Sequence, residues 1–312
     1  MLKIILNRNL VSMTLVIAVV IGAIFLLTTR LPQKNNQNGK IQIVTSFYPL
    51  SYVATAVGGN LVVVRNLVPA GVEPHDFEPS SRDLVEIGMA DIFIFNGASL
   101  EPWVEKWTDG ISEKPGSILN MSESLKKREV RLIERDGITD PHFWLDPTVM
   151  KVEADIVRDL LIEIDPAHKD FYVDNASRLS ASLDALNQRF ISGLSSCQLR
   201  DIVVLHEAFN YLGRQYHLYI TSISGISPDE EPSPKELGRI INHVRAKGIK
   251  HIFAETVASP KFSELITREV GGEMLTLNPI ESLTPNEVQL GEDYFSIMEM
   301  NLNNLQTAMQ CN

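Results

Sequence analysis

The sequence predicts an α/β protein whose sheets are mainly parallel. From Ile41 onward, short runs rich in β-branched residues alternate with stretches that begin at capping residues and end at glycines. Such an alternation of strands and helices is typical of α/β units, in which a helix returns the chain to a parallel neighbouring strand. The chain has 312 residues, which is long enough for two lobes that each have a core.

The first part of the chain, residues 1–40, is predicted to lie outside this fold. Lys3 and Arg8 precede an uncharged apolar run over 10–27, and a polar stretch over 32–40 follows. This arrangement is typical of a secretory signal or a signal anchor with a tether. The run is near the minimum length for spanning a bilayer, no clear Ala-x-Ala cleavage site follows it, and no cysteine lies near it. The basic flank predicts that the body of the protein lies outside the cytoplasm.

The first half of the body is predicted to hold strands at 41–45, 61–67 and 91–95 and helices at 48–57 and 80–88. Gly58-Gly59 ends the first helix, and Ser80 with Asp83 forms a capping-box variant at the start of the second. Functional loops of parallel sheets lie at the carboxyl ends of the strands. The loop over 68–79, with its three prolines and His75, follows a strand and therefore occupies such a position.

A second histidine, His142, is held between two prolines. It follows residues 121–138, which are charged, carry no motif and are predicted to form a surface excursion. Asp140 and Asp146 each precede a proline, and this restricts the backbone on both sides of the histidine. Asp146 is also the expected N-cap of a helix that runs to Ile164. A histidine fixed in this way suits a binding role, and it equally suits a buried loop histidine that the backbone satisfies.

A long helix is predicted from Pro166 to about Leu194, with Asp165 as its N-cap. No glycine or further proline interrupts it before Gly193, and its apolar residues recur at helical spacings. About 29 residues at the rise of an α-helix make a rod of roughly 43 Å, longer than the average helix. Such a rod near the midpoint of the chain would either join two lobes or pack inside one domain.

The second half of the body repeats the alternation, with strands at 201–205 and 249–254 and helices beginning near 207, 234 and 260. His206 stands at the carboxyl end of the first of these strands. Ser233 and Glu236 form a capping box with proline at the first helical position.

Net charge and cysteine content narrow the class of protein. The formal net charge of −11 makes nucleic acid an improbable partner. In an exported protein, the two cysteines, Cys197 and Cys311, predict one disulfide. The alternative is a pair of unbonded thiols.

Three histidines, His75, His142 and His206, fall on three separate loops that each precede a helix. Imidazole is a good ligand for zinc and other late first-row metals, and three histidines with one carboxylate or water complete a tetrahedron. The spacing is no local motif, so ordinary loop histidines remain an alternative. The other histidines are expected to be structural or solvated; they are His168, His217, His243 and His251.

Several segments resemble the zinc- and manganese-binding substrate-binding proteins of ABC importers, the cluster A-I family. Val68–Pro79 resembles the first metal-ligand loop of that family, Asp140–Pro147 the second and Leu205–Leu212 the third. Phe253-Ala254-Glu255 matches a further family segment, and Gly291–Met298 resembles the segment that supplies an acidic ligand. The resemblance extends from about residue 41 to the end of the chain.

The resemblance implies a two-lobed fold with the metal in the cleft between the lobes. It divides the chain into an N-terminal α/β lobe over 41–165, one long rigid linking helix over 166–196 and a C-terminal α/β lobe over 197–312. Each lobe is then a small, mostly parallel sheet flanked by helices. By resemblance, the metal ligands are His75, His142, His206 and, as the acidic fourth ligand, Glu292, with Asp293 beside it as the alternative.

The resemblance also implies what the protein does. It predicts an extracytoplasmic receptor, not an enzyme, that captures a metal ion and delivers it to the membrane permease of an ABC importer. Zinc is favoured and manganese is the second choice, because the manganese branch usually has glutamate at the position of His206. The protein is expected to be monomeric. A departure is that residues 121–138 contain none of the histidines that zinc members often carry in a loop.

Two readings from other classes remain. One is a zinc hydrolase, because Glu207 follows His206 and would act as a general base beside a zinc-bound water. A zincin, however, places its second histidine where this chain has Asn210, and an acidic fourth ligand would fill the position that a catalytic zinc keeps open. The other reading is a metal-free surface adhesin or docking module.

Overall fold

The computed structural model describes residues 39–110, 115–135 and 137–311. Residues 40–312 form one compact unit. Almost all of the segment over 1–40, predicted to be a signal or an anchor, lies outside the described residues. Among the helices of the described part of the chain, none combines the length and apolar character that crossing a bilayer requires.

The first lobe is built on a parallel sheet in the order β2-β1-β3-β4. Its strands are β1 (Ile41–Thr45), β2 (Val62–Asn66), β3 (Ile92–Phe95) and β4 (Ser117–Asn120), and its helices are α2 (Tyr48–Gly58), α3 (Ser81–Met89), α4 (Pro102–Gly110), α5 (Met121–Lys127) and α6 (Pro147–Ile164). The strand residues Ile92, Phe93 and Ile94 are fully buried, as expected where helices cover both faces of a parallel sheet.

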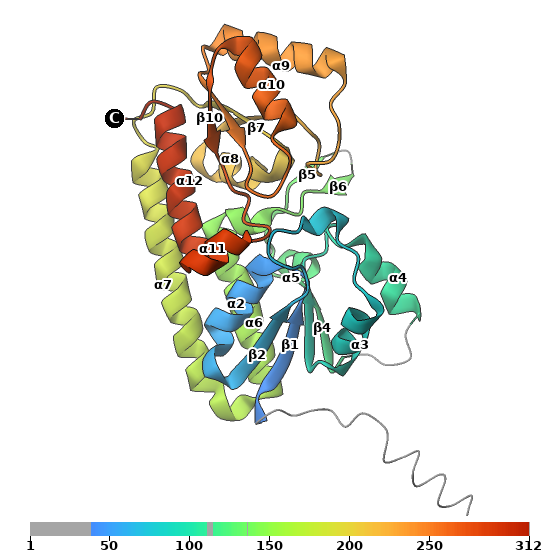
Figure 1. Cartoon of the computed structure of the whole chain (residues 1–312). Coiled ribbons are helices and arrows are strands. Elements are labelled where there is room, and N and C mark those ends of the chain that lie inside the picture. The colour runs from blue at the N-terminus through green and yellow to red at the C-terminus, as the bar shows by residue number, and fades with distance from the viewer. Residues whose placement is uncertain (1–38, 111–114, 136, 312) are drawn as a thin grey trace, which may run out of the picture. The chain divides into compact units, whose positions relative to one another are not determined.

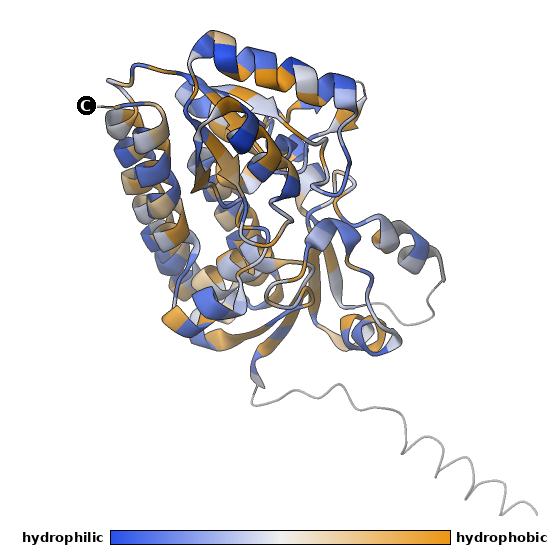
Figure 2. Ribbon diagram, turned by 45° about the horizontal axis from the view of Figure 1, so that its top comes forward, coloured by the Kyte–Doolittle hydropathy of each residue, from blue (hydrophilic) through white to orange (hydrophobic). Residues whose placement is uncertain are grey.

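The second lobe repeats this plan with the strand order β10-β9-β7-β8. Its strands are β7 (Asp201–Val204), β8 (Tyr219–Ser222), β9 (His251–Ala254) and β10 (Glu273–Thr276), and its helices are α8 (Asn210–Tyr216), α9 (Pro234–Lys247) and α10 (Lys261–Val270). The predicted capping box of Ser233 and Glu236 is present at the start of α9. The prediction of two α/β lobes with parallel sheets is therefore confirmed. In Figure 2 the strands are coloured mainly as hydrophobic, whereas the helices carry both colours along their length.

The long helix α7 (Lys169–Gly193) runs from the first lobe to the second, with α12 (Tyr294–Ala308) beside it (Figure 1). The predicted beginning at Pro166 is wrong by one turn, because Pro166–His168 forms a separate 3₁₀ turn, η5, before the α-helix. The buried stripe of α7 includes Leu179, Leu183, Leu186 and Phe190. These side chains belong to one buried cluster with residues of α2, α6 and α12, so α7 is part of the core and not a free strut.

Residues 121–138 are more ordered than the sequence predicts. Asn120 caps α5, whose Met121 and Leu125 are fully buried. Farther on, β5 (Glu134–Arg135) and β6 (Ile138–Thr139) pair as an antiparallel hairpin. The sequence did not indicate these elements, because charged side chains dominate the segment and only a few residues of α5 are buried.

The two cysteines form the predicted disulfide, which joins Cys197 just after α7 to Cys311 just after α12. Both half-cystines also pair their backbones as an isolated antiparallel bridge. The bond therefore ties the last helix to the end of the linking helix.

Loss of this disulfide is expected to lower the free energy of unfolding by up to about 4.7 kcal/mol, the chain-entropy value for a loop of roughly 100 residues. The cysteines are separated by 114 positions, so the bond restricts a large part of the unfolded chain. Urea unfolding of metal-free wild-type protein and of the Cys197→Ser/Cys311→Ser variant measures the difference. Reduced wild-type protein is the control and should match the variant. Two titratable thiols in the oxidised, unfolded protein would contradict the bond.

Candidate metal centre

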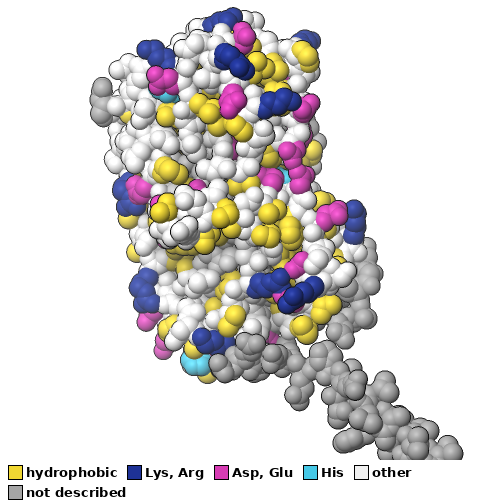
Figure 3. Space-filling view, viewed as in Figure 1, with side chains coloured by type: hydrophobic (Ala, Val, Ile, Leu, Met, Phe, Trp, Pro, Cys, Tyr) yellow, Lys and Arg dark blue, Asp and Glu magenta, His cyan; other side chains and the backbone are white. Residues whose placement is uncertain are grey.

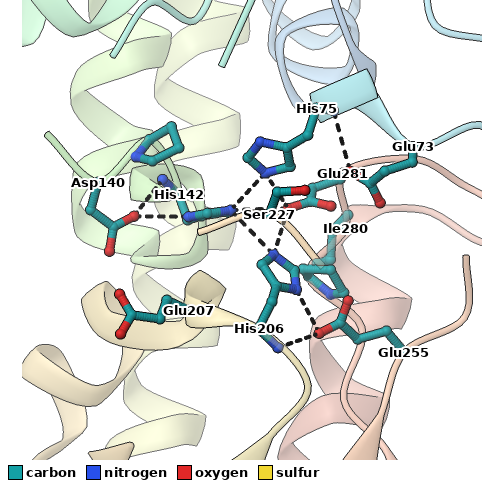
Figure 4. A network of polar contacts seen from close by, with 12 residues as sticks. Glu73, His75, Asp140, His142, His206, Glu207, Ser227, Glu255, Ile280 and Glu281 are labelled. Atoms are coloured by element: carbon teal, nitrogen blue, oxygen red, sulfur yellow. Dashed lines mark hydrogen bonds and ion pairs between the residues drawn. The ribbon is translucent and has the colours of Figure 1, made fainter. Parts of the chain in front are cut away.

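The three predicted histidines converge between the lobes (Figure 4). His75 lies in the 3₁₀ turn η3 (Pro74–Asp76), which follows β2. His142 follows the hairpin strand β6 and precedes η4 (Phe143–Leu145), and His206 follows β7 and precedes η6 (Glu207–Phe209). His142 and His206 are fully buried. The sequence predicted this set, but only folding brings together residues from three distant segments.

The acidic side chain that lies among the three histidines is Glu281 and not the predicted Glu292. Ligand atoms of the four side chains His75, His142, His206 and Glu281 all lie within 4.8 Å of one another. Glu292 follows α11 (Pro285–Leu290) and is outside this group, and Asp293 caps α12 through the backbone N–H of Ser296. Glu281 comes from the loop that follows β10, at the same edge of the second sheet as His206.

The spacing of the four ligand atoms fits a tetrahedral ion. The Nε2 atom of His142 lies 3.3 Å from that of His75 and 3.4 Å from that of His206. Glu281 Oε1 lies 3.1 Å from His142 Nε2, 3.2 Å from His206 Nε2 and 3.7 Å from His75 Nε2. Four ligands held about 2.0–2.1 Å from a zinc ion in a tetrahedron would be separated by roughly 3.3–3.4 Å. The donor set therefore matches zinc in both chemistry and spacing.

Two further carboxylates orient the buried histidines. Asp140 Oδ1 lies 2.8 Å from His142 Nδ1, and Glu255 Oε1 lies 2.7 Å from His206 Nδ1. Each carboxylate accepts the Nδ1 proton, so the Nε2 atom of each ring points to the centre of the group and can bind an ion once it has lost its own proton. Carboxylate–histidine pairs of this kind fix the tautomer and raise the basicity of a metal ligand. Glu255 lies in a segment that carries the family resemblance, but the sequence did not reveal this role.

Electrostatics distinguish the three histidines. Burial opposes the charged form of His206, yet the carboxylates of Glu255 and Glu281 raise its pKa well above the ordinary value. The pKa of His142 is also raised, because the hydrogen bonds to Asp140 and Glu281 outweigh burial. Burial lowers the pKa of His75. Although burial also opposes its charge, Glu281 keeps a pKa well below the ordinary value because the histidines surround it.

A second carboxyl group lies beside His75. Burial and the neighbouring carboxylate of Glu281 raise the pKa of Glu73 to about 9, so Glu73 is protonated at neutral pH. Glu73 also accepts a hydrogen bond of 3.3 Å from the backbone N–H of His75. Glu281 is thus the anionic carboxylate beside the Nε2 atoms of the histidines, and the neutral acid of Glu73 lies next to it.

Backbone strain places Glu281. The preceding residue, Ile280, is fully buried and has a φ of 59°, a left-handed conformation that is rare for a β-branched side chain. The side chain of Asn278 holds this turn, because its Oδ1 accepts the N–H of Ile280 and its Nδ2 donates to Glu287. On the other side, Trp144 Nε1 donates a hydrogen bond of 2.8 Å to the carbonyl of Pro279. This hydrogen bond holds the loop that carries Glu281 against the first lobe.

The fold and the site together define a class: a two-lobed α/β protein with a linking helix and a nitrogen-rich group of possible cation ligands between the lobes. The profile described as "Zinc-uptake complex component A periplasmic" matches residues 43–308. The chain belongs to this family of metal-binding substrate-binding proteins.

Named relatives and solved structures agree with this assignment. The chain is 34% identical over 275 residues to the zinc-binding lipoprotein AdcA of Streptococcus pneumoniae, which covers 85% of this chain and 55% of that protein. It is 28% identical over 285 residues to the high-affinity zinc uptake system protein ZnuA of Bacillus subtilis, covering 88% and 89% of the two chains. The chain spans a little over half the length of the AdcA relatives that it matches.

Two solved structures illustrate the likeness. The Zn(II)-bound ZnuA-like domain of Streptococcus pneumoniae AdcA has a TM-score of 0.75 and 34% identity, covering 87% of this chain and 99% of that one. The laminin-binding protein Lmb of Streptococcus agalactiae, described as having adhesin and metal-transporting activity, has a TM-score of 0.77 and 30% identity, covering 86% and 99%.

Proposed function

We propose that this protein is an extracytoplasmic zinc receptor that delivers the ion to the membrane permease of an ABC importer. The observation that carries the proposal is the buried group of His75, His142, His206 and Glu281 with tetrahedral spacing. Zinc is the cargo, and these four side chains are its ligands. The family is one of substrate-binding transport proteins, and names of relatives such as "high-affinity zinc uptake system protein" support the same role.

Binding without catalysis fits the site better than hydrolysis does. A catalytic zinc keeps one position open for water, whereas four protein donors close this site. The general base that a hydrolase would need is also directed elsewhere. Glu207 Oε1 accepts hydrogen bonds of 2.7 Å from Arg135 Nη1 and 3.3 Å from Ser222 Oγ. The protein is therefore proposed to be a receptor and not an enzyme.

We also propose that the protein is exported to the outer face of a membrane. Residues 1–40 are proposed to serve as an export signal or as a retained anchor with a tether, and residues 41–165, 166–196 and 197–312 as two lobes and their linking helix. On the face shown in Figure 3, the described lysine and arginine side chains are scattered among acidic ones and form no broad basic patch. With a net charge of −11, this surface supports a protein partner and not nucleic acid. We propose a monomer.

Elemental analysis of the protein purified without added metal tests the proposal. About one zinc per chain is expected, with no hydrolysis of ester or peptide substrates. Cells that lack the gene should grow poorly in a zinc chelator, and the wild-type gene should restore growth whereas a His142→Ala gene should not. A protein that takes up no divalent cation would overturn the receptor and favour the adhesin or docking reading.

Zinc affinity is expected to fall as the pH is lowered, starting above pH 6.5. The pKa values of His142 and His206 in the metal-free protein are raised from 6.5, and each imidazole must lose its proton to bind the ion. At a pH below those pKa values, the zinc affinity falls about tenfold per pH unit for each proton that the ion must displace. Titration calorimetry in buffers of different ionisation enthalpy counts the protons released at pH 7. Release of none would contradict the raised pKa values.

A further inference from the structure

A hydrogen-bond network joins Asp140, which orients His142, to the other lobe. Asp140 is 5% exposed. Its Oδ2 atom accepts a hydrogen bond of 3.0 Å from Asn210 Nδ2, and its backbone carbonyl accepts one of 2.9 Å from the hydroxyl of Tyr211. Asn210 and Tyr211 are the first residues of α8 in the second lobe. The second carboxylate oxygen and the carbonyl of Asp140 are thus held from the opposite lobe, while its backbone N–H donates to the carbonyl of Ile133 at 2.9 Å.

Among the described residues, the other oxygen of Asp140 hydrogen-bonds to His142 alone. Oδ1 lies 2.8 Å from the ring Nδ1 and accepts the backbone N–H of His142 at 3.0 Å. This carboxylate therefore sets both the backbone position and the ring orientation of a fully buried histidine. If Asn210 no longer donated to Oδ2, the carboxylate would be free to rotate away from the ring.

Tyr211 connects the same network to the residue before the β5–β6 hairpin. Its hydroxyl accepts the backbone N–H of Ile133 at 2.9 Å while donating to Asp140, and its side chain is fully buried. The Tyr211 and Phe143 rings lie edge to face with centroids 6.3 Å apart. The Tyr211 side chain thus bonds to Ile133, before the β5–β6 hairpin, and to Asp140, after it.

The position of Asn210 in the chain links two histidines of the metal group. Asn210 follows His206 by one helical turn, where a zincin would carry a second histidine. Here the side chain reaches past the site to Asp140. The segment over 206–211 therefore supplies one donor of the metal group directly and controls a second one, from the other lobe, through Asp140.

We propose that Asn210 and Tyr211 are positioning residues for zinc, which hold Asp140 so that His142 keeps its ligand orientation only while the lobes are closed on each other. This inference rests on the proposed zinc function and deepens it. Separation of the lobes would move His206 and Glu281 away and, in the same motion, release the carboxylate that orients His142. Three of the four zinc ligands would then be affected together, which suits a receptor that must hold its cargo tightly and still release it.

Zinc dissociation rates test the proposal, measured on the full protein by mixing the zinc-loaded form with excess chelator. Asn210→Leu removes the donor to Oδ2 at similar side-chain size, and Tyr211→Phe removes the hydroxyl. Each is expected to speed zinc dissociation about tenfold, the lower end of the effect of losing an outer-shell partner. Tyr216→Phe is the matched control, because this tyrosine of the same helix donates instead to Asn187 Oδ1 at 3.0 Å, and its loss should leave the rate unchanged.

A double-mutant cycle separates positioning from general loosening. In an Asp140→Ala background, Asn210→Leu should change the dissociation rate less than about twofold, because the group it acts through is absent. An equal effect of Asn210→Leu with and without Asp140 would overturn the proposal, as would unchanged rates in both single variants.

A readout without zinc keeps this inference distinct from the proposed function. In metal-free protein, the Nδ1 proton of His142 should give a downfield NMR signal from its hydrogen bond to Asp140, and Asn210→Leu should weaken or remove that signal. Loss of the signal in a protein that binds no zinc would sustain the positioning network and overturn only the zinc receptor. If the wild-type protein binds zinc and Asn210→Leu changes neither the NMR signal nor the dissociation rate, the zinc receptor stands and the positioning network is overturned.

Discussion

Replacement of Glu281 by alanine is expected to weaken zinc binding by more than about a hundredfold, beyond the 10–100-fold that loss of an outer-shell partner costs. Glu281 is the one anionic carboxylate among the four donor groups, and its Oε1 lies 3.1 Å and 3.2 Å from the Nε2 atoms of His142 and His206. Without it, a dication would be held by three neutral imidazoles. Competition with a chelator of known zinc affinity measures the loss.

The matched control is Glu292→Ala, which removes the acidic residue that the resemblance indicated as the fourth ligand. Glu292 is not among the grouped donors, so its replacement should leave zinc affinity unchanged. Asp293→Ala removes the cap of α12 and should lower thermal stability without weakening zinc binding directly. A hundredfold loss from Glu292→Ala, with none from Glu281→Ala, would move the ligand back to the predicted position.

Zinc is expected to bind more tightly than manganese by several orders of magnitude. Three imidazole nitrogens and one carboxylate make a nitrogen-rich site, whereas manganese prefers oxygen ligands and stands at the weak end of the divalent series. The tetrahedral spacing also suits zinc, which accepts four ligands. Direct competition of the two ions for the metal-free protein measures the preference, and equal affinities would favour manganese as the cargo.

The preference should narrow in His206→Glu, which exchanges a nitrogen ligand for oxygen and adds negative charge. In the wild-type protein, Glu255 Oε1 lies 2.7 Å from His206 Nδ1, so the new carboxylate would face an existing one. Glu255→Gln is therefore combined with His206→Glu to remove this repulsion, and Glu255→Gln alone is the control. A zinc preference that persists undiminished in the double variant would mean that site geometry, and not ligand type, selects the ion.

Most of the fold was predictable because its signals are local. The strand at 92–95 is a continuous apolar run, and the cap at Ser233 with Glu236 marks the start of α9 as the sequence predicts. The exceptions have local causes as well. The 3₁₀ turn over 166–168 breaks the helical pattern before α7, and the hairpin over 134–139 is too short and too charged to show a strand period.

The sequence by itself determined the α/β alternation, the long helix and the one pair of cysteines that could form a disulfide, because these depend on short-range patterns or on the small number of cysteines. Its resemblance to the family indicated three of the four grouped side chains, His75, His142 and His206. Only the tertiary structure decided that Glu281 completes the group and that Asp140 and Glu255 orient the rings. Glu281 reaches the site because a left-handed Ile280 turns the chain and because Trp144, 135 positions from its hydrogen-bond partner Pro279, holds that loop. A carboxylate selected by long-range packing and backbone strain leaves no periodic signal in the sequence.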